Sequence, residues 1–258
     1  MKKLLALILS ASMLFSFAAC GGSSESKDDD SDKKNSSDIV ENNGGVAEEN
    51  NGFDAYKDDT QNAEYIIFGS YEQDNDLSNG KEPIEWLVLD EKDGKKLVVS
   101  RYVLDALPYN DVDAEVTWDT CSLRNWLNDE FFYQAFTNDE QAKIVTVTVN
   151  SDANPEYNTE QGQDISNKVF LLSAEEAGKY FDSNSERVCE ATSYALAQGV
   201  WTGNPNSTKR SCWWWLRSLG EDLYHAVYVV NYGYVVNRGG DCDGCWDYGV
   251  RPAMWIEL

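Results

Sequence analysis

The pattern of apolar and polar positions divides the chain into three stretches. Residues 4–17 are predominantly apolar, residues 21–63 hold almost no large apolar side chains, and residues 64–258 alternate short apolar runs with polar turns. The first pattern is typical of the hydrophobic core of a signal peptide, and the second is typical of a disordered segment. We therefore expect a signal peptide at 1–20, an acidic tether at 21–63 and a single globular domain at 64–258.

Short apolar runs rich in β-branched and aromatic residues predict strands at both ends of the domain. A turn around Gly94 joins two of them into a hairpin, and Asn231-Tyr232-Gly233 forms a second compact turn. Pro252 falls near the start of the last run, where a missing backbone N–H is tolerated. Strands are expected at 65–69, 84–90, 96–101, 144–149, 168–172, 212–218, 225–230, 234–237 and 249–257.

The middle of the domain carries helical spacing and capping signals. Apolar residues recur at intervals of three and four between Thr120 and Phe136, which predicts one amphipathic helix there. Thr137 with Glu140, and Ser173 with Glu176, have the spacing of capping boxes. Helices are expected at 120–136, 137–143, 173–180 and 190–198. The order of elements predicts an irregular α+β domain, with its N- and C-terminal strands in one sheet and helices packed to one side.

Cys20 closes the apolar segment after Phe17-Ala18-Ala19, and Lys2 and Lys3 open it. This layout is typical of a bacterial lipoprotein signal peptide, in which the cysteine is acylated and becomes the first residue of the mature protein. The apolar run is shorter than the roughly 20 residues that span a bilayer. We therefore expect an extracytoplasmic protein, anchored to the cell membrane by lipid on Cys20.

The charge balance narrows the class of partner. The chain has 45 acidic and 21 basic residues, and its formal net charge is −24. Nucleic-acid binding relies on Lys and Arg to neutralise phosphates, so no nucleic-acid partner is expected. The nine Trp residues are expected mainly in the core, with an aromatic binding surface as the second interpretation.

Two segments near the C-terminus carry a family resemblance. Trp214–Gly220 reads WWLRSLG and Gly249–Ile256 reads GVRPAMWI. With Phe68–Tyr71, Pro83–Trp86 and similar upstream segments, they make the chain resemble the bacterial domain-of-unknown-function family 6273, of the surface lipoprotein type. Leu219 stands where that family usually has proline. The resemblance implies no activity, and a more distant similarity to formylglycine-generating enzymes implies a C-type-lectin-like fold.

Six residues are candidates for ligand contact. Side chains alternate along a strand, so Trp213 and Trp215 share one face and Trp214 lies on the other. One face is expected in the core, whereas the other is available for stacking on a sugar or peptide. Arg217 and Arg251, which lie in the two motif segments, are interpreted first as buried hydrogen-bonding residues and second as ligand residues. The candidates are Trp213, Trp215, Arg217, Tyr232, Trp246 and Arg251.

An acidic loop offers a possible cation site. Asp241, Asp243 and Asp247 supply carboxylates that suit calcium, although a solvated acidic loop is the alternative. No other cofactor is expected, and His225, as the single histidine, excludes a histidine-rich metal site. The sequence does not decide whether the remaining cysteines are thiols or disulfides. They are Cys121, Cys189, Cys212, Cys242 and Cys245.

Three functional hypotheses remain open. The first is a non-enzymatic, lipid-anchored module that binds a glycan or cell-wall polymer. The second is an extracytoplasmic hydrolase that uses carboxylates, and the third is a structural or interaction domain of an envelope complex. The sequence contains no nucleophile motif or phosphate-binding loop, and no catalytic residue is nominated.

Overall fold

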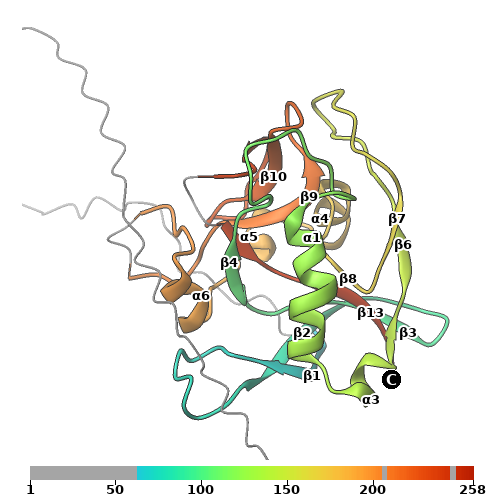
Figure 1. Cartoon of the computed structure of the whole chain (residues 1–258), viewed down its shortest axis with the longest axis vertical. Helices are drawn as coiled ribbons and strands as arrows, with labels where there is room; N and C mark the ends of the chain where they lie inside the picture. The colour runs from blue at the N-terminus through green and yellow to red at the C-terminus, as the bar shows by residue number, and fades with distance from the viewer. Residues whose placement is uncertain (1–62, 205–207, 245–247) are drawn as a thin grey trace, which may run out of the picture. The chain divides into compact units, whose positions relative to one another are not determined.

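The described part of the chain comprises residues 63–204, 208–244 and 248–258 of a computed structural model (Figure 1). The expected signal peptide, Cys20 and nearly all of the tether lie outside these residues. Within them, strands outnumber helices and form three sheets. No helix among the described residues combines the length and the apolar character needed to cross a membrane.

The largest sheet joins strands from both ends of the domain. In spatial order it contains β1 (Tyr65–Tyr71), β2 (Glu82–Lys92), β3 (Lys95–Ser100), β13 (Ala253–Glu257) and β5 (Ile144–Val145), and β8 (Val169–Phe170) also pairs with β13. All its pairs are antiparallel. Strand β13 lies inside the sheet, where Trp255 is opposite Leu97 on one side and Val145 on the other.

The second sheet is built mainly from the C-terminal part of the domain. Its order is β11 (Val235–Asp241), β10 (His225–Val229), β9 (Trp214–Leu219), β12 (Tyr248–Val250) and β4 (Asp105–Leu107). The pairing of β12 with β9 is parallel and the other pairs are antiparallel. A separate two-stranded sheet contains β6 (Val147–Val149) and β7 (Ile165–Asn167).

The last predicted strand, at 249–257, is two strands in different sheets. Strand β12 ends at Val250 and β13 begins at Ala253. Pro252 lies between them and has no backbone N–H for a ladder, but its carbonyl accepts a 2.9 Å hydrogen bond from the Ser100 N–H. The break at proline therefore carries the chain from the second sheet into the first.

The helix predicted at 120–136 forms with one irregularity. It consists of α1 (Ser122–Trp126), a π-helical turn η1 (Leu127–Phe131) and α2 (Phe132–Ala135), which Figure 1 shows as one continuous rod. A π-helical turn shifts the register of the following side chains. Phe131, at the end of this turn, and Phe132, which follows it, are both buried.

Both predicted capping boxes are confirmed. Thr137 caps α3 (Asn138–Gln141) with Glu140, and Ser173 caps α4 (Ala174–Tyr180) with Glu176. The Glu140 carboxylate also accepts a 3.0 Å hydrogen bond from the Gly69 N–H, which ties α3 to β1. A side chain at Gly69 would collide with Phe136, and its φ of +70° also favours glycine.

The helix predicted at 190–198 begins later than expected. Helix α6 (Ser193–Gln198) starts after Thr192, whose hydroxyl caps it, and ends at Gly199 in the left-handed conformation. Glu190 and Ala191 instead form isolated bridges with Ser211 and Val103. The expected elements do not include helix α5 (Asn184–Arg187), although Ser183 caps it locally by accepting a hydrogen bond from the Glu186 N–H. They also omit strand β4, which depends on pairing with the distant β12.

Large aromatic side chains fill the core, as composition suggests. Trp86, Trp214 and Trp215 are completely buried, and so is Tyr109. The indole N–H of each of these three tryptophans donates to a backbone carbonyl, as that of Trp86 does to Phe68 at 2.7 Å.

The fold as a whole is mixed α and β with mostly antiparallel strands, and its helices are few and short.

Candidate functional site

Trp213 and Trp215 lie on one face of the second sheet, as the alternation predicts. Both rings contact Tyr228 and Tyr248, with ring centres 4.2 to 6.3 Å apart. Trp215 is fully buried and its indole N–H donates to the Leu107 carbonyl at 2.9 Å. Trp215 is therefore a core residue, whereas Trp213 is only partly buried.

Two of the remaining aromatic candidates, Trp213 and Tyr232, are partly or largely exposed. Trp213 packs edge-on against Trp201, and its indole N–H lies 3.4 Å from the Asn231 side-chain oxygen. Tyr232, at the turn between β10 and β11, is 60% exposed. Trp246 and Asp247 lie outside the described residues. A role of these rings in ligand contact stays a prediction.

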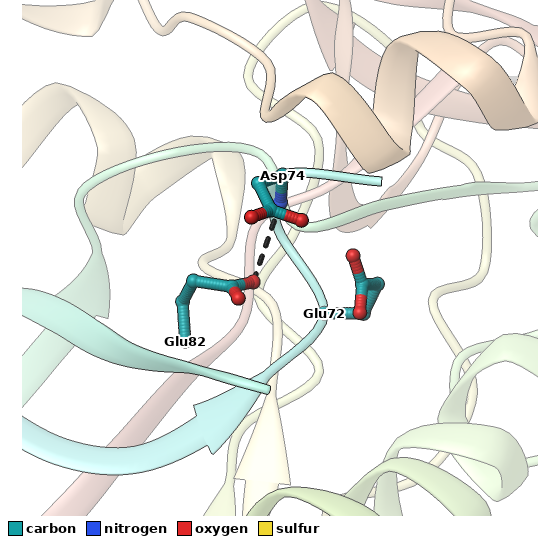
Figure 2. Close-up of side chains that lie close together, drawn as sticks. All are labelled: Glu72, Asp74 and Glu82. Carbon is teal, nitrogen blue, oxygen red and sulfur yellow. Dashed lines mark hydrogen bonds between the residues drawn. The ribbon is translucent and has the colours of Figure 1, made fainter. Parts of the chain in front are cut away.

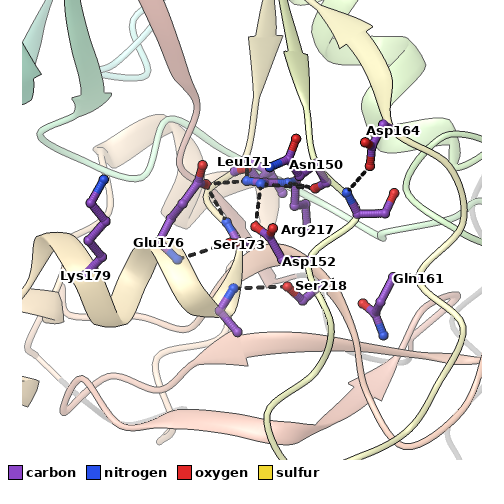
Figure 3. A network of polar contacts seen from close by, with 12 residues as sticks. Asn150, Asp152, Gln161, Asp164, Leu171, Ser173, Glu176, Lys179, Arg217 and Ser218 are labelled. Atoms are coloured by element: carbon purple, nitrogen blue, oxygen red, sulfur yellow. Dashed lines mark hydrogen bonds and ion pairs between the residues drawn. The ribbon is translucent and has the colours of Figure 1, made fainter. Parts of the chain in front are cut away.

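Arg217 lies in a buried polar network beside α4 (Figure 3). Its guanidinium is 3.0 Å from the Leu171 carbonyl and 3.1 Å from the Asp152 carboxylate, and it also pairs with Glu176. The backbone carbonyl of Asn150 accepts two longer hydrogen bonds from the same group. This set of contacts agrees with the first reading of Arg217, as a residue that holds segments of the fold together.

Arg251 is also buried, between two aromatic rings. Its guanidinium carbon lies 4.9 Å from the Trp214 ring centre and 5.3 Å from that of Phe181. The Nε atom donates to the Ser100 carbonyl at 3.0 Å, but the buried Nη1 has no hydrogen-bond partner. The ring contacts place a cation over aromatic faces, which stabilises it inside the core.

The predicted calcium loop is only partly described. Asp241 is exposed and its carboxylate lies 3.0 Å from Nε2 of His225, while Asp222 lies 2.6 Å from Nδ1 of the same ring. Asp243 is exposed as well. Among the described residues, the carboxylates that gather closely enough to hold an ion lie elsewhere, at Glu72, Asp74 and Glu82. A calcium site at 241–247 stays a prediction.

The four described cysteines are buried free thiols. Burial raises the pKa of Cys121 to about 12, and it also raises the pKa of each of the other three. A thiol in such surroundings is inert, because only the thiolate attacks an electrophile or binds a metal. Cys245, three residues after Cys242, lies outside the described residues.

A polar groove of about 450 Å³ runs between the β1–β2 loop and the start of α6. One wall comes from Gln73 to Glu85, the other from Glu190 to Ser193 with Arg210, and the Tyr102 side chain also lines it. Its size falls within the range of small-molecule sites. The sequence alone does not predict this groove, because segments that are distant in the chain form it.

Backbone and side-chain contacts fix the walls of the groove. The Tyr194 N–H donates to the Gln73 carbonyl at 3.0 Å, which joins α6 to the β1–β2 loop. Arg210 donates to the Ala191 carbonyl at 2.8 Å, and Ala191 donates back to the Arg210 carbonyl. The Arg101 guanidinium pairs with Glu85 at 2.6 Å. The groove is therefore preformed.

Acidic groups predominate along the groove. Asp74, Glu82, Glu85 and Glu190 line it, and Arg210 is the one basic residue among the lining side chains. Hydrogen bonds from the Asn79 side chain and the Asp76 N–H lower the pKa of Asp74. Asp74 therefore stays ionised at neutral pH, and the groove favours a neutral or positively charged ligand over an anion.

Three carboxylates meet at one end of this groove (Figure 2). One oxygen from each of Glu72, Asp74 and Glu82 lies within 4.8 Å of the others. Burial raises the pKa of Glu72 and the charges of Glu82 and Asp74 raise it further, although a hydrogen bond from the Asn75 N–H opposes them. The signal in the sequence is the acidic run 74–76 between two predicted strands, followed by the acidic start of the second strand.

A second hollow, of about 350 Å³, lies beside α1. Its lining combines the partly buried Trp126 with Asn125, Asp129 and Glu130. The combination of a ring, an amide and carboxylates also suits a polar ligand. We place the main candidate site in the larger groove, which the three-carboxylate cluster adjoins.

The family model described as Domain of unknown function (DUF6273) matches residues 93–258. The chain belongs to this family. No curated protein matches the chain, and no solved structure matches it either. The family assignment confirms the resemblance read from the WWLRSLG and GVRPAMWI segments, and the similarity to a C-type-lectin-like fold stays a prediction.

The DUF6273 match covers one side of the groove. Tyr102, the segment Glu190 to Ser193 and Arg210 lie within the matched residues. The opposite wall, from Gln73 to Glu85, precedes the match, as do the motif segments Phe68–Tyr71 and Pro83–Trp86. The groove therefore combines a surface from the DUF6273 region with one from the strands that precede it.

Proposed function

We propose that this protein is an extracytoplasmic binding module, held at the cell membrane by lipid on Cys20, whose groove binds a glycan or another cell-wall polymer. The observation that carries the proposal is the preformed, acidic groove with an aromatic side chain in it. Carboxylates accept hydrogen bonds from sugar hydroxyls, while Arg210 donates them, and a tyrosine ring provides an apolar face. A neutral or amine-bearing sugar fits this charge.

The location rests on the N-terminal pattern that ends at Cys20. A tether of about 40 residues has an r.m.s. span of roughly 35 Å as a flexible coil, enough to separate a domain from the membrane surface. Metabolic labelling with a fatty-acid probe should mark the native chain and leave a Cys20→Ala variant unmarked. A native chain without label, or one found in the cytosol, contradicts the proposal.

We also propose a C-type-lectin-like organisation of the domain. Its support is the joining of N- and C-terminal strands, β1 and β13, in one sheet, together with long irregular segments between the strands. An experimental structure that places the domain in another fold class contradicts this part of the proposal without affecting the groove.

Binding is tested with the full chain on a glycan array and in pull-down with purified cell walls. We expect Tyr102→Ala to weaken binding about tenfold, as loss of a contact residue at the centre of a site does. Tyr133→Ala is the matched control, because Tyr133 is 64% exposed and lies outside the groove. Absence of binding to any glycan or cell-wall preparation contradicts the proposal.

Two further variants separate this site from the alternatives. Loss of binding in Trp213→Ala but not in Tyr102→Ala places the site on the aromatic face of the second sheet instead. A hydrolase needs two carboxyl groups on either side of the bond that it cleaves, and the acidic lining of the groove makes this a question for activity measurements. Release of new reducing ends from bound glycan would establish the hydrolase, and specific crosslinking to an envelope protein would favour the interaction domain.

A further inference from the structure

The three-carboxylate cluster lies where β1 leads into the loop before β2. Glu72 directly follows β1, Asp74 lies in the loop, and Glu82 is the first residue of β2. One oxygen from each carboxylate lies within 4.8 Å of the other two. Among the described residues, no Lys, Arg or His forms an ion pair with any of the three. Three carboxyl groups therefore meet without a basic side chain to pair with them.

Hydrogen bonds hold two of these carboxylates in place. The Asp76 N–H and the Asn79 side chain each donate to Asp74 at 2.7 Å. The Gln73 and Asp74 N–H groups donate to one oxygen of Glu82, at 2.7 and 3.3 Å. A carboxylate oxygen has two lone pairs, so these donors orient the groups and leave acceptor capacity for another ligand.

Glu72 supplies an independent observation. It is only 7% exposed, and its buried Oε1 atom has no hydrogen-bond partner. Figure 2 shows one oxygen of its carboxylate pointing toward the Asp74 side chain. A buried carboxylate oxygen without a partner is costly, and buried charges in proteins are normally paired or coordinate a metal. The orphaned oxygen therefore indicates a missing cation.

We propose that Glu72, Asp74 and Glu82 bind a calcium ion. The donors are all oxygen atoms, which suits a hard divalent cation, whereas zinc sites are built mainly from histidine and cysteine. Calcium–oxygen distances of about 2.3 to 2.6 Å place opposite ligands roughly 4.6 to 5.2 Å apart, whereas magnesium requires about 4.2 Å or less. The three oxygen atoms lie within 4.8 Å of one another, close enough to ligate one ion, and calcium accepts the irregular geometry of a loop more readily than magnesium, which demands an octahedral site.

The ion would also affect the adjoining groove. Asp74 and Glu82 line the groove and also belong to the cluster, and Gln73, between Glu72 and Asp74, accepts a hydrogen bond from the Tyr194 N–H in α6. A bound ion fixes this wall and reduces its negative charge. The calcium site stands independently of the proposed glycan binding, because its evidence is the cluster itself.

The test measures thermal unfolding and calorimetric binding of the full chain, first in EDTA and then with calcium at constant ionic strength. We expect one site with a dissociation constant of about 0.1 to 1 mM, as in extracellular calcium modules. Calcium should raise the unfolding temperature more than magnesium does. Glu82→Gln should weaken binding by at least about tenfold, because it removes one charged ligand.

The Glu72→Gln variant distinguishes a calcium ligand from a residue that only supports the fold. Without calcium this variant should unfold at a higher temperature than the native chain, because it removes a buried charge without a partner. It should show little or no response to calcium. Glu82→Gln, at a less buried position, tests the site even where Glu72→Gln does not fold.

Two control variants separate the cluster from general screening of this acidic chain. Asp113→Asn removes an exposed carboxylate away from the cluster and should respond to calcium like the native chain. Asp241→Asn tests the other acidic loop. Three results would overturn the proposal. The first is a rise in unfolding temperature with calcium that is no larger than the rise with magnesium at about 10 mM. The second is an equal calcium response in Glu82→Gln and Asp113→Asn, and the third is a calcium response that is lost only in Asp241→Asn.

Discussion

Glu176 hydrogen bonds to the N-terminus of α4 and at the same time forms an ion pair with the guanidinium of Arg217. One carboxylate therefore closes a local capping box and joins α4 to strand β9. Ser218, the next residue in β9, contributes a further bond, since its hydroxyl accepts from the Ala174 N–H at 3.0 Å. The family-motif segment of β9 thereby fixes the position of a helix (Figure 3).

Replacing Arg217 with methionine should destabilise the domain by about 3 kcal/mol, because Glu176 and Asp152 lose their shared cation in a buried setting. Arg238→Met is the control, since Arg238 pairs with Glu221 at the surface and such pairs contribute about 1 kcal/mol or less. Chemical denaturation of both variants measures the difference. Equal effects at the two positions contradict a structural role for the buried network.

The capping role of Glu140 predicts that the stability of the domain depends on pH. Burial alone would raise the pKa of this carboxyl, but hydrogen bonds from Thr137 and the Gly69 N–H outweigh burial, and the pKa is lowered. A group with a lowered folded-state pKa stabilises the fold above its unfolded value, and this contribution is lost as pH falls through the folded value. Glu140→Gln should therefore cost about 1 kcal/mol at neutral pH.

The difference in unfolding free energy between the native chain and Glu140→Gln should begin to narrow near pH 4.5, where the carboxyl of the unfolded chain takes up a proton, and should be lost as pH falls through the lower pKa of the folded state. Denaturant titrations at several pH values measure it, and the subtraction removes the contribution of the other acidic groups. A difference that stays constant down to pH 2 would mean that the charge of Glu140 does not contribute.

Trp215 and Tyr232 were both candidates for ligand contact, but their surroundings predict opposite effects on stability. Trp215 is fully buried, so Trp215→Ala should cost about 4 kcal/mol through lost packing and an internal cavity. Tyr232 is 60% exposed, and Tyr232→Ala should stay within about 0.5 kcal/mol of the native chain. Thermal unfolding compares the two, and a mild effect at Trp215 would contradict its place in the core.

The buried thiols should react slowly in the folded chain. At pH 8 a thiol with a pKa near 12 holds very little thiolate, so alkylation of Cys121 should be at least about 100-fold slower in the native state than in denaturant. Cys189, Cys212 and Cys242 should be protected too, since burial raises their pKa values as well. Peptide mass spectrometry after timed alkylation follows each cysteine separately, and rapid modification of Cys121 would contradict this prediction.

Local signals in the sequence predicted local structure well. The capping boxes at Thr137 and Ser173 begin helices where expected, and Gly199 ends α6. The alternation that pairs Trp213 with Trp215 on one face is also confirmed by their shared contacts with Tyr228 and Tyr248. In each of these cases the determining contacts lie within a few residues of one another.

What the sequence did not predict depends on distant contacts. The break at Pro252 separates two sheets whose partners, β3 and β9, lie far away in the chain. The groove needs three segments together, and the orphaned oxygen of Glu72 becomes evident only once its burial is known. Acidic residues are frequent in this chain, so their spacing alone did not distinguish the cluster at 72–82 from the loop at 241–247.

The interior position of β13 has a consequence for biogenesis. Strand β3 and the short strands β5 and β8 are synthesised early, yet each must wait for β13 before its edge is paired. The ribosome thus releases nearly the whole domain before the largest sheet can close. A chain with this order of assembly cannot complete its core before β13 has been synthesised.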